Sequence, residues 1–375
     1  MDSVLHGCRR AGEKRRNTRG AYWTVRCLIG LVTHRRMNDS KNEGLQAARA
    51  LAALSVAYYH SYVAVRGFPE TAWTPIFPLS QWGYLGVDLF FAVSGYVICL
   101  VASKPSFSRW SFFIKRVFRL YPMYWTAMTI VAALALSGHY HANSVGHFLY
   151  SMTLLPQSGA PAYDLSWTLE REIVFYLLAM VAVPAVGIRG LAVVLAVLSV
   201  AGWHFGEQWT FHLISIRQAS FLAGVLVFMA APWVARFGCI APLAVGIAAL
   251  GCFLVSNWDP LRPVAMTFIL AGMANLQLPW ARWPYRWIIA AGDASYSIYL
   301  LHYIVFYLAM AASVILFVWL PGLRQDWLCE PYRWAAIIAA CIISHFTWKF
   351  IERPMIALGN GIAAQRSLVS IEAEQ

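Results

Sequence analysis

The chain has 375 residues, of which 60% are hydrophobic and only 12% are charged. A soluble globular domain has about twice that share of charged residues, so this sequence has too little polar surface for a water-soluble protein of its size. The same figures exclude a disordered chain and a small disulfide scaffold. The class that remains is an all-α polytopic membrane helix bundle, because an apolar helix of about 20 residues crosses the hydrocarbon core.

The net charge of +12 is concentrated at the N-terminus. Residues 1–46 contain ten Lys or Arg against four Asp or Glu, so this segment alone contributes +6. A basic segment ahead of membrane spans is typical of a cytoplasmic anchor, and we favour this interpretation over nucleic-acid binding. We expect residues 1–44 to be a disordered cytoplasmic segment. Met37 is as good a start as Met1, in which case residues 1–36 would be a translated leader.

Ten apolar stretches follow, each long enough for one membrane span. They cover about residues 47–65, 82–102, 121–137, 167–186, 189–204, 212–231, 240–256, 262–278, 293–319 and 334–350. The loops expected outside contain few basic residues, namely Arg66, Arg262, Arg324 and Arg333. This bias predicts ten spans with both termini cytoplasmic, in a bacterial inner membrane. We expect one integral membrane domain over residues 45–355 and a short cytoplasmic tail over 356–375.

Ionisable side chains within spans are costly and are therefore candidate site residues. The first span contains Arg49 and His60, eleven residues apart. Eleven residues make close to three whole helical turns, so both side chains face the same way, about 16 Å apart along the axis. The alternative is an arginine that extends to the membrane surface and an interfacial histidine.

The fourth span opens with the sequence LSWTLEREIVFYLL, which contains two glutamates. Glu170 and Glu172 lie about 200° apart on a helix, so they cannot face the same site. Glu172 shares a face with Tyr176, four residues later. Helix N-termini favour acids through the helix dipole, which explains one glutamate without any site.

The loop after the second span reads FFIKRVFRLYPMYW and contains Arg116 and Arg119. These two are neighbours if the segment is helical, and we expect them at the cytoplasmic surface. Arginine pairs bind phosphates through charge-assisted hydrogen bonds, although ordinary positive-inside charge also accounts for them. The seven cysteines show no CxxC spacing, so we interpret them as core residues and expect no metal site.

Two further polar residues lie within apolar stretches. Asp88 in GVDLFFAVSGYVI is a candidate buried acid, either structural or a partner for a basic group. His302 in GDASYSIYLLH is as compatible with a hydrogen-bonded packing residue as with a site residue.

In chain order these motifs resemble the acyltransferase-3 family of integral membrane O-acyltransferases, in the branch similar to exopolysaccharide-production acetyltransferases. The motifs are Arg49 with His60; GVDLFFAVSGYVI; Arg116-x-x-Arg119 with LYPMYW; WTLEREIVFYLL; IRQASFLAGVLVF with Arg217; GDASYSIYLLH with Tyr296; and Glu352-Arg353-Pro354. WTLEREIVFYLL departs from the commoner WSLSVEEQFY form of the family. Glu172 aligns with the first family glutamate, Glu170 replaces a small residue, and Ile173 stands where the second family glutamate would be.

The resemblance implies transfer of an acyl group, usually acetyl, from cytoplasmic acetyl-CoA to a hydroxyl of an envelope or exported carbohydrate such as exopolysaccharide or O-antigen. The residues that it implies as catalytic are His60 as general base, Glu172 to orient His60 or bind the acceptor, and Arg49 to guide the acyl arm or polarise the thioester. It implies Arg116 and Arg119 as the CoA-binding pair. Substrate-binding or structural roles would fall to Asp88, Tyr176, Arg217, Tyr296 and His302.

The expected partners are an acyl-CoA donor, an envelope polysaccharide or lipid-linked sugar, and membrane lipids, with no nucleic acid. A transporter or flippase for a lipid-linked sugar is the main alternative, but it should show matching hydropathy halves, which the sequence lacks. A non-catalytic scaffold explains the spans but not the positions of His60, Glu172 and the arginine pair.

Overall fold

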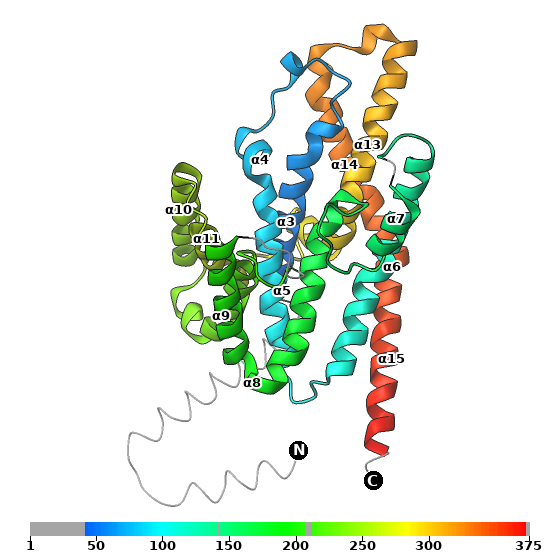
Figure 1. The fold of residues 1–375 in the computed structure, drawn as a ribbon. Coiled ribbons are helices and arrows are strands. Elements are labelled where there is room, and N and C mark those ends of the chain that lie inside the picture. The colour runs from blue at the N-terminus through cyan, green and yellow to red at the C-terminus, as the bar shows by residue number, and fades with distance from the viewer. Residues whose placement is uncertain (1–41, 142, 207–211, 373–375) are drawn as a thin grey trace, which may run out of the picture. The chain divides into compact units, whose positions relative to one another are not determined.

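The computed structural model describes residues 42–141, 143–206 and 212–372. Most of the predicted disordered segment 1–44 therefore lies outside the described residues. The described part is built from helices joined by short turns (Figure 1), in agreement with the all-α prediction. The long helices are α3 (Glu43–His60), α5 (Gly86–Ala102), α6 (Arg109–Leu136), α8 (Trp167–Phe205), α9 (Gln218–Val234), α10 (Ile240–Ser256), α11 (Leu261–Ala274), α12 (Tyr285–Asp293), α13 (Ser295–Trp319), α14 (Cys329–Thr347) and α15 (Arg353–Glu372). Two shorter helices are α4 (Phe77–Trp82) and α7 (Val145–Ser151).

Every predicted span coincides with a helix or with half of one. α8 covers two predicted spans and breaks at Gly187, whose φ of 70° suits a residue without a Cβ. α6 begins at Arg109, twelve residues before the predicted span at 121–137. The tail predicted over 356–375 is helical as far as Glu372, because α15 continues the last span.

Lipid-facing surfaces are visible on these helices. Within the described residues, five helical stretches are long and apolar enough to cross a membrane, and α10 and α11 are shorter apolar helices. The side of α8 that contains Val193, Val197 and Val200 is more than 60% exposed at each of these valines. Such a surface is unfavourable in water and favourable in hydrocarbon. The protein is therefore an integral membrane protein.

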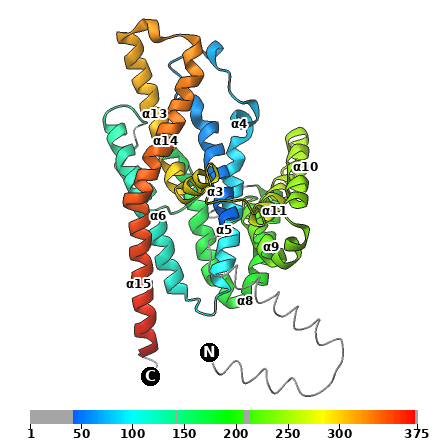
Figure 2. The same cartoon turned by 180° about the vertical axis from the view of Figure 1, so that it is seen from behind.

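α5 is the most enclosed of these apolar helices and packs between α3 and α9. A Cβ on Gly95 of α5 would lie 2.1 Å from the carbonyl oxygen of Phe221, and one on Gly224 of α9 would lie 1.8 Å from that of Ala92. These two glycines thus allow the close helix crossing that membrane bundles use. α9, α10 and α11 lie on one side of α5, and α6, α13, α14 and α15 lie on the other (Figures 1 and 2).

A π-helical turn at Trp348–Glu352 joins α14 to α15. Pro354 is the second residue of α15, and because proline has no backbone N–H it cannot complete the regular hydrogen-bond ladder there. α15 then packs along α6: the Ser111 hydroxyl donates to the carbonyl of Ala363 at 3.2 Å. The first turns of α6 are therefore held against α15.

Candidate active site

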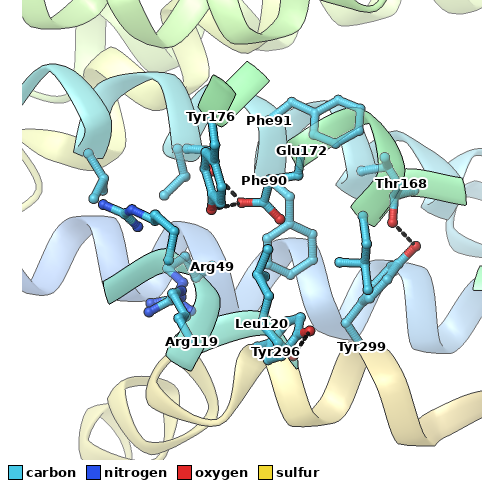
Figure 3. Close-up of a pocket in the computed structure, with 16 residues that line it drawn as sticks. Arg49, Phe90, Phe91, Arg119, Leu120, Thr168, Glu172, Tyr176, Tyr296 and Tyr299 are labelled. Atoms are coloured by element: carbon cyan, nitrogen blue, oxygen red, sulfur yellow. Dashed lines mark hydrogen bonds between the residues drawn. The ribbon is translucent and has the colours of Figure 1, made fainter. Parts of the chain in front are cut away.

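A pocket of about 100 Å³ lies among α3, α5, α6, α8 and α13. Its charged lining consists of Arg49, Arg116, Arg119 and Glu172. Figure 3 shows Arg49 and Arg119 at one end of the pocket and the pair of Thr168 and Tyr299 at the other. The pocket therefore has a strongly charged end and a mostly aromatic end.

The arginine end is formed because the predicted loop at FFIKRVFRLYPMYW is helical. Ser108 caps α6, with its hydroxyl accepting from the Ser111 backbone N–H at 3.5 Å. Within this helix the spacing of three residues places Arg116 and Arg119 on one face, as expected. The expectation that they lie in a surface loop is wrong, because they belong to α6 and both side chains are partly buried and line the pocket.

Arg116 and Glu172 are linked through Tyr176. The guanidinium of Arg116 lies 5.2 Å from the centre of the Tyr176 ring and 5.2 Å from that of Phe112. The Tyr176 hydroxyl donates to Oε1 of Glu172, and the Ser94 hydroxyl donates to the same oxygen at 2.6 Å. The carboxylate is thus held by two donors, and the shared face of Glu172 and Tyr176 is as the sequence predicted.

Arg49 interacts electrostatically with Glu352, Asp293 and Glu172 and is repelled by Arg119. Its closest hydrogen-bond partner is Oε1 of Gln46, 3.4 Å from Nη1. In the part of the chain that the structure describes, the arginine–carboxylate ion pairs involve other arginines and none of the three in the pocket. Three arginines and one carboxylate line the pocket itself, and arginines without a direct carboxylate partner can bind an anionic ligand there.

The aromatic end is fixed by two tyrosines of α13. Tyr296 donates to the backbone carbonyl of Leu120 at 2.8 Å, which ties α13 to α6. The Tyr299 hydroxyl lies 2.7 Å from the Thr168 hydroxyl and donates to the carbonyl of Leu165 at 3.1 Å, which ties α13 to α8. The Tyr296 hydroxyl therefore helps to hold the wall of the pocket in place.

His60 and His302 lie together beyond this aromatic end. Nδ1 of His60 is 3.1 Å from Nε2 of His302, and the ring centre of His302 is 6.0 Å from that of Tyr299. Neither histidine lines the pocket. Glu172 was expected to orient His60 or bind the acceptor. Among the described residues, however, the hydrogen-bond partners of its carboxylate are Ser94 and Tyr176, so it does not orient His60.

Asp88 belongs to a separate buried cluster at the junction of α5, α9 and α11. It is 1% exposed, and its carboxylate accepts from Nη2 of Arg262 at 2.8 Å and from the Ser220 hydroxyl at 2.7 Å. Nη1 of Arg217 lies 3.6 Å from the same carboxylate. The expectation that Arg262 lies in an outer loop is wrong, since it belongs to α11 and its side chain is 14% exposed.

Arg333 was also expected in an outer loop and is instead a buried residue of α14. It is 1% exposed, and its Nε donates to Glu330 Oε2 at 2.9 Å. Its Nη1 donates to the Ser61 hydroxyl at 3.1 Å. Long apolar stretches can contain such paired arginines without losing their character as spans.

Glu170 lies on the other side of α8 from Glu172 and faces a second pocket. Its side chain is 1% exposed and accepts from Gln157 at 2.8 Å, while Nε2 of His212 lies 3.2 Å away. The 200° separation predicted for the two glutamates thus leads them to different surroundings.

Sequence reasoning missed two residues of this region. Ser94 holds Glu172 and lies in the motif that was examined only for Asp88. Glu352 is 2% exposed, accepts from the Ser297 hydroxyl at 2.7 Å and contributes to the field at Arg49. The motif Glu352-Arg353-Pro354 was the signal that could have identified it. Among the described residues, no group of three or more His, Cys, Asp or Glu could hold a metal ion.

Comparison with known proteins decides the family. A family model described as an acyltransferase domain matches residues 42–350. The chain belongs to this acyltransferase family. The resemblance drawn from the motifs is therefore confirmed, and the protein is an O-acyltransferase enzyme of the membrane rather than a transporter.

Two relatives cover most of the chain. Exopolysaccharide production protein ExoZ of Rhizobium meliloti (strain 1021) is 27% identical over 319 residues, which cover 78% of this chain and 95% of the relative. Nodulation protein 10 of Rhizobium leguminosarum bv. viciae is 24% identical over 335 residues, which cover 76% of this chain and 85% of the relative. No solved structure matches the chain.

Proposed function

We propose that this acyltransferase transfers an acyl group, in the first instance acetyl, from cytoplasmic acyl-CoA to a hydroxyl of an exopolysaccharide or another envelope or exported carbohydrate. The observation that carries the donor assignment is the pocket of three arginines and one glutamate within a membrane domain. A polyanionic donor such as acyl-CoA matches this charge. The carbohydrate acceptor is supported by the relative that is named for exopolysaccharide production.

Arg116 and Arg119 hold phosphate groups of the donor at the charged end of the pocket. Pockets that enclose a whole drug-sized ligand measure about 300–1,000 Å³, whereas this one encloses about 100 Å³. The pocket therefore receives the slender acyl-pantetheine arm, and the nucleotide part remains at the arginine end. Glu172 and Tyr176 fix the position of Arg116 beneath the donor.

Arg49 guides the arm rather than polarising the thioester. Arg49 and His60 are separated by about 16 Å along the axis of α3, too far for both side chains to act on one carbonyl group and its attacking hydroxyl. The chemistry is assigned to the His60 end. His60 removes the proton of the acceptor hydroxyl as its oxygen attacks the thioester carbonyl, a C–O bond forms, the C–S bond breaks, and the CoA thiolate takes the proton from His60.

The arginine end faces the cytoplasm, where CoA is found, and His60 lies toward the opposite face of a bacterial inner membrane. The distribution of Lys and Arg between the spans supports this orientation, with both termini cytoplasmic. Acceptors on that side are envelope polysaccharides or lipid-linked sugars.

The test uses membrane vesicles that contain the full chain, with labelled acetyl-CoA and the isolated polysaccharide as substrates, and labelled succinyl-CoA in a parallel assay. We expect ester transfer with the intact chain and a decrease of about 10²–10⁴-fold in His60→Ala, the range for losing a general base. His345→Ala, which removes an exposed histidine near the end of α14, serves as the matched control and should retain full transfer. Unchanged transfer in His60→Ala would overturn the base assignment, and no ester in the polysaccharide would overturn the acceptor.

A further inference from the structure

We propose that His302 is a positioning residue that fixes the tautomer of His60, so that Nε2 of His60 is the nitrogen that accepts the proton. The catalytic consequence rests on the proposed function, in which His60 is the base. The hydrogen-bond chain itself rests only on the geometry of α3 and α13.

The chain of hydrogen bonds starts at a backbone carbonyl. Nδ1 of His302 lies 3.0 Å from the carbonyl oxygen of Ile298, one turn earlier on α13. A carbonyl oxygen can only accept, so Nδ1 of His302 carries a hydrogen. A neutral imidazole has one N–H, and Nε2 of His302 is therefore a bare acceptor.

The second link follows from the first. Nε2 of His302 is 3.1 Å from Nδ1 of His60. Since that atom of His302 accepts, Nδ1 of His60 must donate, and Nε2 of His60 is left with a free lone pair.

The surroundings keep His302 neutral. It is fully buried, and the rings of Tyr299, Tyr303 and Phe306 surround it. In the described ranges its hydrogen-bond partners are the Ile298 carbonyl and His60, with no carboxylate among them. An imidazolium there would be a buried, unpaired charge, which is strongly unfavourable.

Burial also divides the roles between the two histidines. His302 is 0% exposed, whereas His60 retains partial exposure. Only His60 can therefore meet an acceptor hydroxyl. The two ring planes are inclined by 26°, and Tyr303 packs edge-on against the His60 ring with a centre-to-centre distance of 5.2 Å, so the His60 ring is held in place as well as in tautomer.

The arrangement is similar to a catalytic triad, in which a third group orients the base. Here the orienting group is a neutral imidazole. When Nε2 of His60 takes the proton of the hydroxyl, Nδ1–H of His60 continues to donate to His302. This hydrogen bond stabilises the imidazolium that His60 has become. The proton then passes from Nε2 to the departing thiolate. His302 changes neither its protonation nor its partners during this cycle.

The first experiment is structural. The full chain, labelled with ¹⁵N-histidine and reconstituted in lipid bilayers, is studied by ¹⁵N NMR, and the His60 signals are assigned by their loss in His60→Ala. We expect His60 to carry its hydrogen on Nδ1 in the unaltered protein and to change its tautomer population in His302→Leu. His302→Gln should restore the Nδ1–H form, because its amide oxygen can accept from His60 and its amide N–H can donate to Ile298.

The second experiment is kinetic. His302→Leu should lower kcat by at least about tenfold, the equivalent of one hydrogen bond, and leave the apparent KM for acyl-CoA unchanged. His302→Gln should recover most of the rate. His345→Leu is the matched control, because it makes the same substitution at an exposed histidine of α14 and should change neither the tautomer nor kcat.

The two proposals fail in different ways. If His60→Ala is inactive but His60 carries its hydrogen on Nε2, or keeps its Nδ1–H in His302→Leu, the inference about His302 is wrong while the base assignment stands. If the tautomer depends on His302 but His60→Ala transfers at the full rate, the base assignment is wrong while the hydrogen-bond chain stands. Equal loss of folded protein in His302→Leu and His302→Gln, with no rescue by glutamine, would also contradict the positioning role.

Discussion

Two charged clusters lie within the helical bundle; α5 contributes Asp88 to one of them and contacts the other through Ser94. The closed cluster consists of Asp88, Arg217, Ser220 and Arg262, and the open cluster consists of Arg49, Arg116, Arg119 and Glu172. In the closed cluster the carboxylate of Asp88 accepts from Arg262 and Ser220 and pairs with Arg217. In the open cluster the carboxylate is held by Ser94 and Tyr176, and the arginines surround a pocket.

The two clusters differ in how their charged side chains are paired within the protein. A buried charge must be paired or hydrogen-bonded, or it is strongly unfavourable. The closed cluster meets this requirement within the protein and thereby ties α5, α9 and α11 together. Among the described residues, no arginine of the open cluster lies within ion-pair distance of a carboxylate, and all three line a cavity in which they could contact a bound anion. Buried charge alone therefore does not identify a site; arginines that line a cavity without a direct carboxylate partner do.

The largest effect is expected from a substitution in the closed cluster, and it is an effect on stability. Asp88→Ala removes the buried carboxylate that both Arg262 and Arg217 contact, which should lower the free energy of unfolding by about 3–5 kcal/mol. The measurement is thermal or denaturant unfolding in detergent micelles. Transfer activity per folded molecule should remain close to that of the unaltered chain.

Asp259→Ala is the matched control for this substitution. Asp259 also pairs with Arg262, at 3.1 Å, but its own side chain is 51% exposed. Exposed ion pairs contribute about 0–1 kcal/mol, so the stability should change little. If both substitutions had the same small effect, the closed cluster would not stabilise the fold as argued.

The next largest effect is expected from a substitution in the open cluster, and it is an effect on donor binding. Arg116→Ala should raise the apparent KM for acyl-CoA by about 10–100-fold, since a charge-assisted hydrogen bond contributes about 1.5–3 kcal/mol. Because Arg116 has no carboxylate partner among the described residues, the free energy of unfolding should stay the same or rise slightly. Steady-state kinetics with labelled acetyl-CoA in vesicles measures the first quantity, and unfolding in micelles the second.

Lys115→Ala separates this effect from general positive charge. Lys115 is exposed on the same turn of α6 and should leave KM nearly unchanged. An equal rise in KM for both variants would mean that the surface charge of α6, rather than the pocket, attracts the donor.

The sequence predicted the helices well and their partners poorly. The apolar helices follow from long apolar runs, a strong and local signal, and the shared face of Glu172 and Tyr176 follows from helical periodicity alone. The start of α6 was missed because Lys115, Arg116 and Arg119 make that segment look like a loop. Only packing against α15 and the pocket explains why it is helical and partly buried.

Pairings across the bundle could not be predicted. Arg262 is 174 residues from Asp88 along the chain, and His302 is 242 residues from His60. No local pattern connects such residues, because their contacts depend on how α3, α5, α11 and α13 pack. The motif resemblance could mark Asp88, His60 and His302 as candidates, but it did not mark Arg262 and could not distinguish the closed cluster from the open one.

The smallest effect tests how the open cluster is supported. Tyr176→Phe keeps the ring beside the Arg116 guanidinium and removes the hydroxyl that donates to Glu172. The loss of one hydrogen bond, about 1 kcal/mol, leaves the carboxylate with a single donor and more able to compete with the phosphates for Arg116. We expect the apparent KM for acyl-CoA to rise by about fivefold, measured as for Arg116→Ala.

Tyr176→Ala removes the ring as well and should raise KM further, because Arg116 then loses a cation–π contact. Tyr121→Phe is the matched control: its hydroxyl donates to the carbonyl of Thr153 at 2.7 Å, and the residue does not line the pocket. If Tyr176→Phe matched this control, the hydroxyl would be irrelevant to the donor. If it matched Tyr176→Ala, the ring would be irrelevant. An intermediate KM means that the open cluster depends on two contacts of Tyr176: the hydroxyl orients the carboxylate, and the ring orients the arginine. Both contacts keep the positive charge of the cluster directed at the cavity.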